Sequence, residues 1–211
     1  MSDPNAQSSN ATSLTLTATN NSSVPGLQYF NVYPPLLKNL PAAQQTQTAL
    51  VSEPTLHDGS NTAISWASGS DALSILAVTN GQILSKAEQT PIRLGQTATV
   101  SYPNSTFAIA ISDGGTADII TVAFTAPIPI HSQIGLVVGP APILVAVPAS
   151  LSSLTLEPDL SQQVTVTFGS PFVWPAAEET DTSIPTVVTF AAGQTSATIT
   201  IGPDNLIVQN D

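Results

Sequence analysis

The sequence predicts an all-β protein, an antiparallel β-sandwich of the jelly-roll or immunoglobulin-like kind, with roughly 12–16 short strands and little or no helix. Short runs rich in Val, Ile and Thr recur along the chain, and 18 prolines and 12 glycines punctuate them. Residues 119–156 contain no Asp, Glu, Lys or Arg, but the five prolines among them exclude a membrane-spanning helix. These observations favour strands throughout.

The first third of the chain begins with a polar arm over residues 1–13. Residues 14–19 alternate apolar and polar side chains and predict a strand, which the Asn- and Ser-rich residues 20–23 end. Residues 28–33 predict a second strand, closed by two prolines. Residues 36–49 predict a loop with a single helical turn, because Pro41 interrupts any longer helix.

The middle third continues with short strands separated by turn residues. Asn80 and Gly81 predict a hairpin turn, and Gly114 and Gly115 predict a later reversal. The predicted strands are residues 63–66, 73–78, 82–85, 97–102, 106–111 and 118–125.

The charge-free stretch centres on two apolar runs, residues 134–138 and 143–147, joined by Gly139-Pro-Ala-Pro142. Neither run alternates, so we expect both faces of this hairpin to be shielded from water. One face can be the core of the domain; the other needs a second layer, a covering loop or a neighbouring subunit. We therefore take the apolar side chains of the hairpin as candidates for self-association: Ile134, Leu136, Val138, Ile143, Val145 and Val147.

The last third predicts strands at residues 154–156, 163–168, 186–190, 197–201 and 206–208. We expect one large sandwich domain over residues 14–211. A similarity between Gly95-Gln-Thr and Gly193-Gln-Thr, each followed by alternating residues, leaves open two modules of about 14–112 and 113–211. The same pattern is also typical of any turn that leads into an exposed strand.

The charge balance limits the classes of partner. The chain has fourteen acidic residues and only three basic ones, Lys38, Lys86 and Arg93, which gives a formal net charge of −11. Three cations cannot neutralise a phosphate backbone, so we expect no nucleic-acid partner, and an anionic membrane is disfavoured for the same reason. Self-assembly would have to use apolar contacts. The absence of cysteine removes disulfides, thiolate metal sites and cysteine nucleophiles.

Histidines and carboxylates give no catalytic or metal pattern. His57 lies beside Asp58 and His131 lies far along the chain, with no second ligand at metal spacing and no nucleophile motif. Glu178 and Asp181 are weak calcium candidates, because the alternating acidic pattern of a calcium loop is missing. We expect no enzyme activity, no resident metal and no cofactor.

Two tryptophans suggest an alternative. Trp66 precedes a polar turn, and Trp174 precedes a loop with Glu178, Glu179 and Asp181. Tryptophan beside carboxylates can hold a sugar ring by stacking and hydrogen bonding. A tryptophan that caps the end of the core fits the same pattern.

The sequence thus predicts a non-enzymatic structural or self-associating β-protein that forms a homo-oligomer through apolar strand surfaces. The alternative is a carbohydrate-binding or adhesive module with a glycan partner. Residues 1–7 do not resemble a signal peptide, so the cytoplasm is the default compartment, with extracellular or surface release left open.

Overall fold

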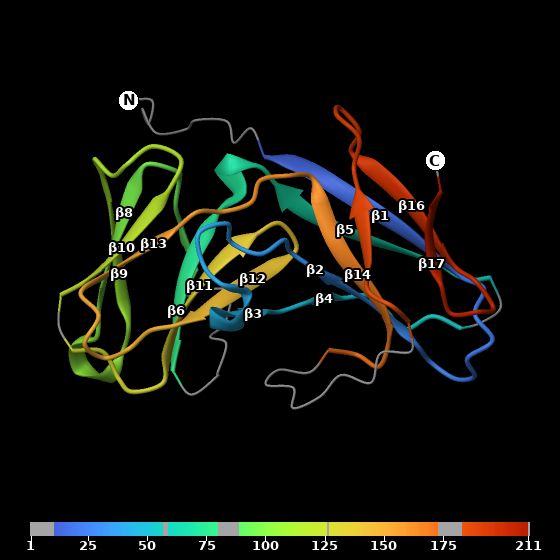
Figure 1. Cartoon of the computed structure of the whole chain (residues 1–211), viewed down its shortest axis with the longest axis horizontal. Helices are drawn as coiled ribbons and strands as arrows, with labels where there is room; N and C mark the ends of the chain where they lie inside the picture. Colours follow the sequence, from blue (N-terminus) through green and yellow to red (C-terminus); the bar gives the residue numbers. More distant parts are fainter. Residues whose placement is uncertain (1–10, 57–58, 80–88, 126, 173–182, 211) are drawn as a thin grey trace, which may run out of the picture.

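The computed structural model describes residues 11–56, 59–79, 89–125, 127–172 and 183–210. Over these ranges the chain forms seventeen strands in four sheets, with three short 3₁₀ turns and no α-helix (Figure 1). The all-β prediction is confirmed. The strand number exceeds the predicted range partly because β4 (Leu50–Val51) and β7 (Thr90–Pro91) are two-residue strands.

Two of the sheets are built mainly from the two ends of the chain. Sheet I has the order β17-β16-β1-β5, and sheet II has the order β15-β14-β2-β4. Their remaining bounds are β1 Thr12–Asn20, β2 Tyr29–Tyr33, β5 Asn61–Ser68, β14 Gln163–Gly169, β15 Thr186–Thr189, β16 Ser196–Ile201 and β17 Ile207–Asn210. β1 and β16 pair in parallel, with Thr15 opposite Ser196.

The other two sheets come mainly from the middle of the chain. Sheet III has the order β3-β12-β11-β6-β7, and sheet IV has the order β13-β10-β8-β9. Their bounds are β3 Gln45–Gln47, β6 Ser74–Thr79, β8 Gln96–Ser101, β9 Ala108–Asp113, β10 Ile120–Phe124, β11 Ser132–Val138, β12 Ala141–Ala146 and β13 Ser153–Leu156. Figure 1 shows sheet IV at one extremity of the molecule and sheet I toward the other.

Each pair of sheets shares one hydrophobic core. The terminal core lies between sheets I and II and includes the ring pair Phe30–Phe168, whose centroids are 5.0 Å apart. The central core lies between sheets III and IV and is mostly aliphatic. These cores follow from strand alternation, because every second residue of β1, β14 and β16 faces inward.

Strand β3 connects the two cores. It lies between β2 and β4 in the sequence, yet it pairs with β12 of sheet III. The side chain of Gln45 stabilises this connection. Its Oε1 accepts a hydrogen bond from the N–H of Leu37, and its Nε2 donates to the C=O groups of Leu37 and Leu40. The predicted loop over residues 36–49 contains the expected short helical turn, Ala42–Gln44, and also this unexpected strand.

Several boundaries differ from those predicted. β1 begins at Thr12, inside the predicted arm, because Thr12 and Ser13 pair with Ser68 and Ala67. β9 starts two residues later than predicted because the 3₁₀ turn Pro103–Ser105 precedes it. The predicted strand over residues 82–85 and its turn lie outside the described residues.

The hairpin β11–β12 is shielded on both faces within one chain. One face contributes to the central core, and the other carries a second buried cluster of Leu76, Val78 and Leu144. Gly135 makes room for that cluster: a Cβ there would lie 2.8 Å from side-chain atoms of Leu76 and Leu144.

Candidate functional site

The six hairpin residues predicted to mediate self-association all lie inside the central core. Ile134, Leu136 and Ile143 have no exposed surface, and Val138, Val145 and Val147 are at most 4 % exposed. The chain supplies its own covering layer for this face, since sheet IV packs against it. In the folded chain Ile134, Leu136 and Ile143 therefore present no surface to a second copy, and the three valines present very little.

Trp66 caps the terminal core instead of lining an open surface. It is 8 % exposed, and its ring meets Phe190 edge-on with centroids 5.7 Å apart. Gly139, at the β11–β12 turn, lies beside the indole, since a Cβ there would be in van der Waals contact with Nε1 at 3.5 Å. This packing leaves no free ring face for sugar stacking. Trp174, Glu178, Glu179 and Asp181 lie outside the described residues.

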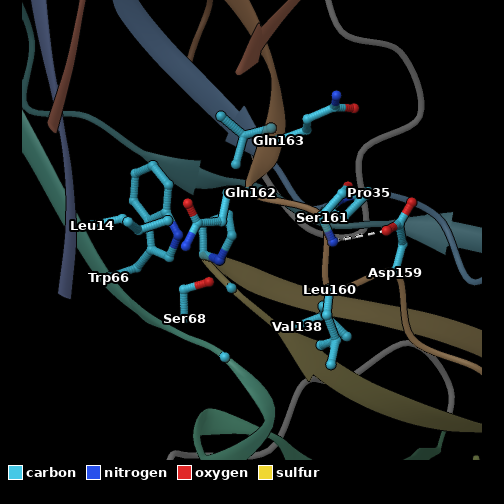
Figure 2. Close-up of a pocket in the computed structure, with 14 residues that line it drawn as sticks. Leu14, Pro35, Trp66, Ser68, Val138, Asp159, Leu160, Ser161, Gln162 and Gln163 are labelled. Atoms are coloured by element: carbon cyan, nitrogen blue, oxygen red, sulfur yellow. Dashed lines mark hydrogen bonds between the residues drawn. The ribbon is translucent and has the colours of Figure 1, made fainter. Parts of the chain in front are cut away.

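The surroundings of Trp66 form a joint between the two cores. Figure 2 shows Trp66 together with Leu14, Ser68, Val138 and residues 159–163. The space left at this joint is about 10 Å³, which is at most enough for one water molecule. The joint is thus a packed structural contact and not a ligand site.

Asp159 is the charged group at the joint. Its Oδ1 accepts a hydrogen bond from the Ser161 N–H at 2.9 Å and lies 3.7 Å from Lys38 Nζ. Partial burial acts to raise the pKa of Asp159, but the hydrogen bonds from Ser161 and the charge of Lys38 together outweigh it. The pKa of Asp159 is therefore lower than that of a free carboxyl.

Histidines and carboxylates form no metal site in the part of the chain that the structure describes, because no three of them cluster. His131 is exposed and adopts a left-handed backbone conformation with φ of 64°. Asp113 accepts a hydrogen bond from Gln96 Nε2 at 2.8 Å. His57 and Asp58 lie outside the described residues.

A shallow apolar hollow lies at the ends of β11 and β12 that are remote from their turn. Its volume is about 680 Å³, and no charged side chain lines it. The lining residues are Ala43, Gln44, Ile130, His131, Ser132, Val145, Ala146, Val147, Pro148, Ala149, Leu151 and Leu154. We call this feature the apolar hollow. Sequence reasoning missed it, although most of its residues belong to the charge-free stretch.

The sheet edges differ in how they are covered. The Asn39 side chain donates a hydrogen bond to the C=O of Thr155 on β13 and accepts one from the N–H of Glu157. The Gln209 side chain bonds both the N–H and the C=O of Thr189 on β15. Pro91 interrupts the short β7, since proline has no backbone donor.

Strand β9 has no comparable cover among the described residues. It pairs only with β8, through six residue pairs, and forms the outer edge of sheet IV. Ala108, Ala110 and Ser112 are exposed along it, and Asp113 is its only charged residue. An edge strand with so little charge can accept another strand.

Comparison of the chain with protein-family models, curated proteins and solved structures finds no match. Among the described residues, no helix has the length and apolar character needed to cross a bilayer.

Proposed function

We propose that the chain is a non-enzymatic, structural β-protein that self-associates by pairing of its β9 edges. In this proposal each pair of sheets is a β-sandwich of the jelly-roll or immunoglobulin-like kind, and sheet IV continues into a second copy. The observation that supports it is the uncovered β9 edge, because the exposed backbone donors and acceptors of an edge strand favour addition of another strand.

The contrast with the other edges supports the choice of β9. Side-chain amides cover β13 and β15, and proline interrupts β7. β5 is the other long edge, but Trp66 and Ser68 near its end are part of the joint. β9 instead is the edge of sheet IV, which lies at one extremity of the molecule (Figure 1).

Two-fold antiparallel pairing of β9 satisfies the burial pattern. Directly opposite residues of paired strands share a face, so Ala110 can lie opposite Ala110 of the second copy. Ile109 then lies opposite Ile111 of the second copy, on the face that packs against the central core. Asp113 falls beyond the centre of this register and does not face its own equivalent, which avoids like-charge contact.

The net charge predicts how this association responds to salt. At −11 each copy repels the other, and added salt screens that repulsion. Association through β9, whose one charged residue is Asp113, should therefore strengthen as ionic strength rises. Association through ion pairs would weaken.

The test is sedimentation equilibrium of the full chain over a range of concentrations, with matched lysine variants. Ala110→Lys should abolish association, because two lysines would oppose each other at the centre of the paired edges. Ala63→Lys, at an exposed alanine of β5, should leave association unchanged. The proposal is overturned if the native chain stays monomeric at its solubility limit, or if Ala63→Lys abolishes association while Ala110→Lys does not.

Glycan binding has less support from the described residues, because Trp66 is packed at the joint. Its remaining candidate is Trp174 with Glu178, Glu179 and Asp181. Titration of tryptophan fluorescence with polysaccharides tests it. A glycan that changes the signal of native protein but not of Trp174→Phe would support this alternative.

A further inference from the structure

We propose that the apolar hollow is a binding site for a neutral, mainly aliphatic small molecule with one uncharged polar group. This inference does not depend on pairing at β9, which lies on a different part of the central core.

The size and lining of the apolar hollow suit such a ligand. Its volume of about 680 Å³ falls within the roughly 300–1,000 Å³ typical of small-molecule sites. Val145, Val147, Leu151 and Leu154 supply an aliphatic lining. At the rim Ile130 is 73 % exposed, so a bound molecule would remove its apolar surface from water.

One wall of the hollow is already fixed in the free chain. Val145 and Val147 are at most 4 % exposed because they also belong to the central core. The N–H of Val147 donates to Ser132 O at 3.0 Å, which joins the two strands beside the hollow. On the side formed by these strands a ligand would therefore meet a preformed wall.

The polar groups of the lining can offer an uncharged contact to a ligand. The Ser132 hydroxyl already donates to Pro129 O at 2.6 Å. The side chains of Gln44 and His131 make no hydrogen bond to any other described residue, so either one can bond a hydroxyl or carbonyl of the ligand.

The charge of the chain argues for a neutral ligand. The lining contains no Lys or Arg to pair with an anion, and the chain carries a net charge of −11. The lining also has no Asp or Glu to pair with a cation. A charged end group would lose water on binding and gain no opposite charge in return.

The direct test is calorimetric titration of the full chain with straight-chain alcohols from hexanol to decanol. Each added methylene should tighten binding about fourfold until the hollow is filled, because burial of a methylene contributes that factor. Decanoate, of equal length but charged, should bind at least tenfold more weakly than decanol. Absence of saturable binding by every alcohol, or tighter binding of decanoate, overturns the proposal.

Two pairs of matched variants locate the binding. Ala146→Trp fills the hollow from an exposed position on β12 and should abolish decanol binding, whereas Ala63→Trp, at an exposed position on β5, should not change it. Ile130→Asp should weaken binding at least tenfold. Ile184→Asp is its control, since Ile184 is 68 % exposed but lies outside the hollow.

The same variants separate this inference from self-association. Ala110→Lys should remove association and leave decanol binding intact. If instead Ala146→Trp abolishes association and decanol dissociates the oligomer, the hollow receives a second copy of the chain, and the small-molecule proposal is overturned. Equal loss of decanol binding in Ala146→Trp and Ala63→Trp also overturns it, since binding would then be non-specific.

Discussion

The hairpins β11–β12 and β8–β9 belong to opposite walls of the central core, yet their surroundings differ. β11–β12 lies between β3 and β6, and residues on both of its faces are buried. In β8–β9 the outer strand is the edge of its sheet, and its residues alternate between partly buried and exposed. The uninterrupted apolar runs of β11 and β12 are therefore buried on both faces of the hairpin, whereas the alternating residues of β9 leave one face exposed to water.

This difference predicts what a charge does in each hairpin. At a buried position of β11–β12 a charged side chain should strongly destabilise the fold. In β9 it should leave the fold intact and change only what the chain associates with. The following substitutions test the comparison, in order of decreasing effect.

Val145→Lys should have the largest effect. Val145 is 3 % exposed in the central core, and lysine there would bury an unpaired charge. We expect a loss of more than about 4 kcal/mol in the free energy of unfolding, measured by urea denaturation. Ala110→Lys is the matched change in the other hairpin and should cost less than about 0.5 kcal/mol. Similar stability losses in the two variants would contradict the comparison.

Gly135→Ala should destabilise the protein by about 1–3 kcal/mol, because the new methyl group overpacks a buried layer. The affected neighbours are Leu76 and Leu144, each at most 1 % exposed. Leu144→Val should recover part of the loss when it is combined with Gly135→Ala. If the stability losses of the two single variants simply add in the double variant, by thermal and urea unfolding, this face of the hairpin has room for the extra methyl group.

Asn39→Ala would make the covered edge of sheet IV resemble the uncovered one. It removes the hydrogen bonds to Thr155 O and from the Glu157 N–H, at a cost of about 1 kcal/mol. It also frees β13 for pairing, so sedimentation should show stronger association. Asn61→Ala removes an exposed hydrogen bond with Thr19 and serves as the control. An increase in association in both variants would show that cover by Asn39 is not the reason β13 stays unpaired.

Asp159→Asn should have the smallest effect and concerns the joint beside the β11–β12 turn. The pKa of Asp159 is lowered in the folded chain, so its stabilising contribution is present above about pH 4, the range of a free carboxyl. That contribution is lost as the pH falls through the folded pKa. Urea midpoints measured between neutral and acid pH should therefore fall less steeply for Asp159→Asn than for the native chain. Parallel curves would assign no such role to Asp159.

Local sequence pattern predicted most strands closely. The strand predicted at residues 163–168 appears as β14, Gln163–Gly169, and that at residues 197–201 appears as β16, Ser196–Ile201. Side-chain alternation and turn residues are local signals, so they locate strands well. They do not select the partner of a strand: the parallel pairing of β1 with β16 joins segments far apart in the sequence.

The candidate sites were harder to predict for the same reason. The hairpin sequence indicated two shielded faces, but not that sheet IV provides the shield for Val145 and its neighbours. Trp66 precedes a polar turn, and only its contacts with Gly139 and Phe190 place it in a packed joint. The apolar hollow combines residues 43–44 with residues 130–154, a combination set by the crossing of β3.

The parallel pair β1–β16 also bears on how the chain folds as it emerges from the ribosome. The middle of the chain can assemble sheets III and IV once β13 has been synthesised, because β3 precedes the other strands of that core. β1 must wait for β16, nearly the whole length of the chain later. During that interval the inward-facing Leu14 and Leu16 have no completed layer to pack against. Nascent chains stalled before β16 should therefore be the species most dependent on chaperones.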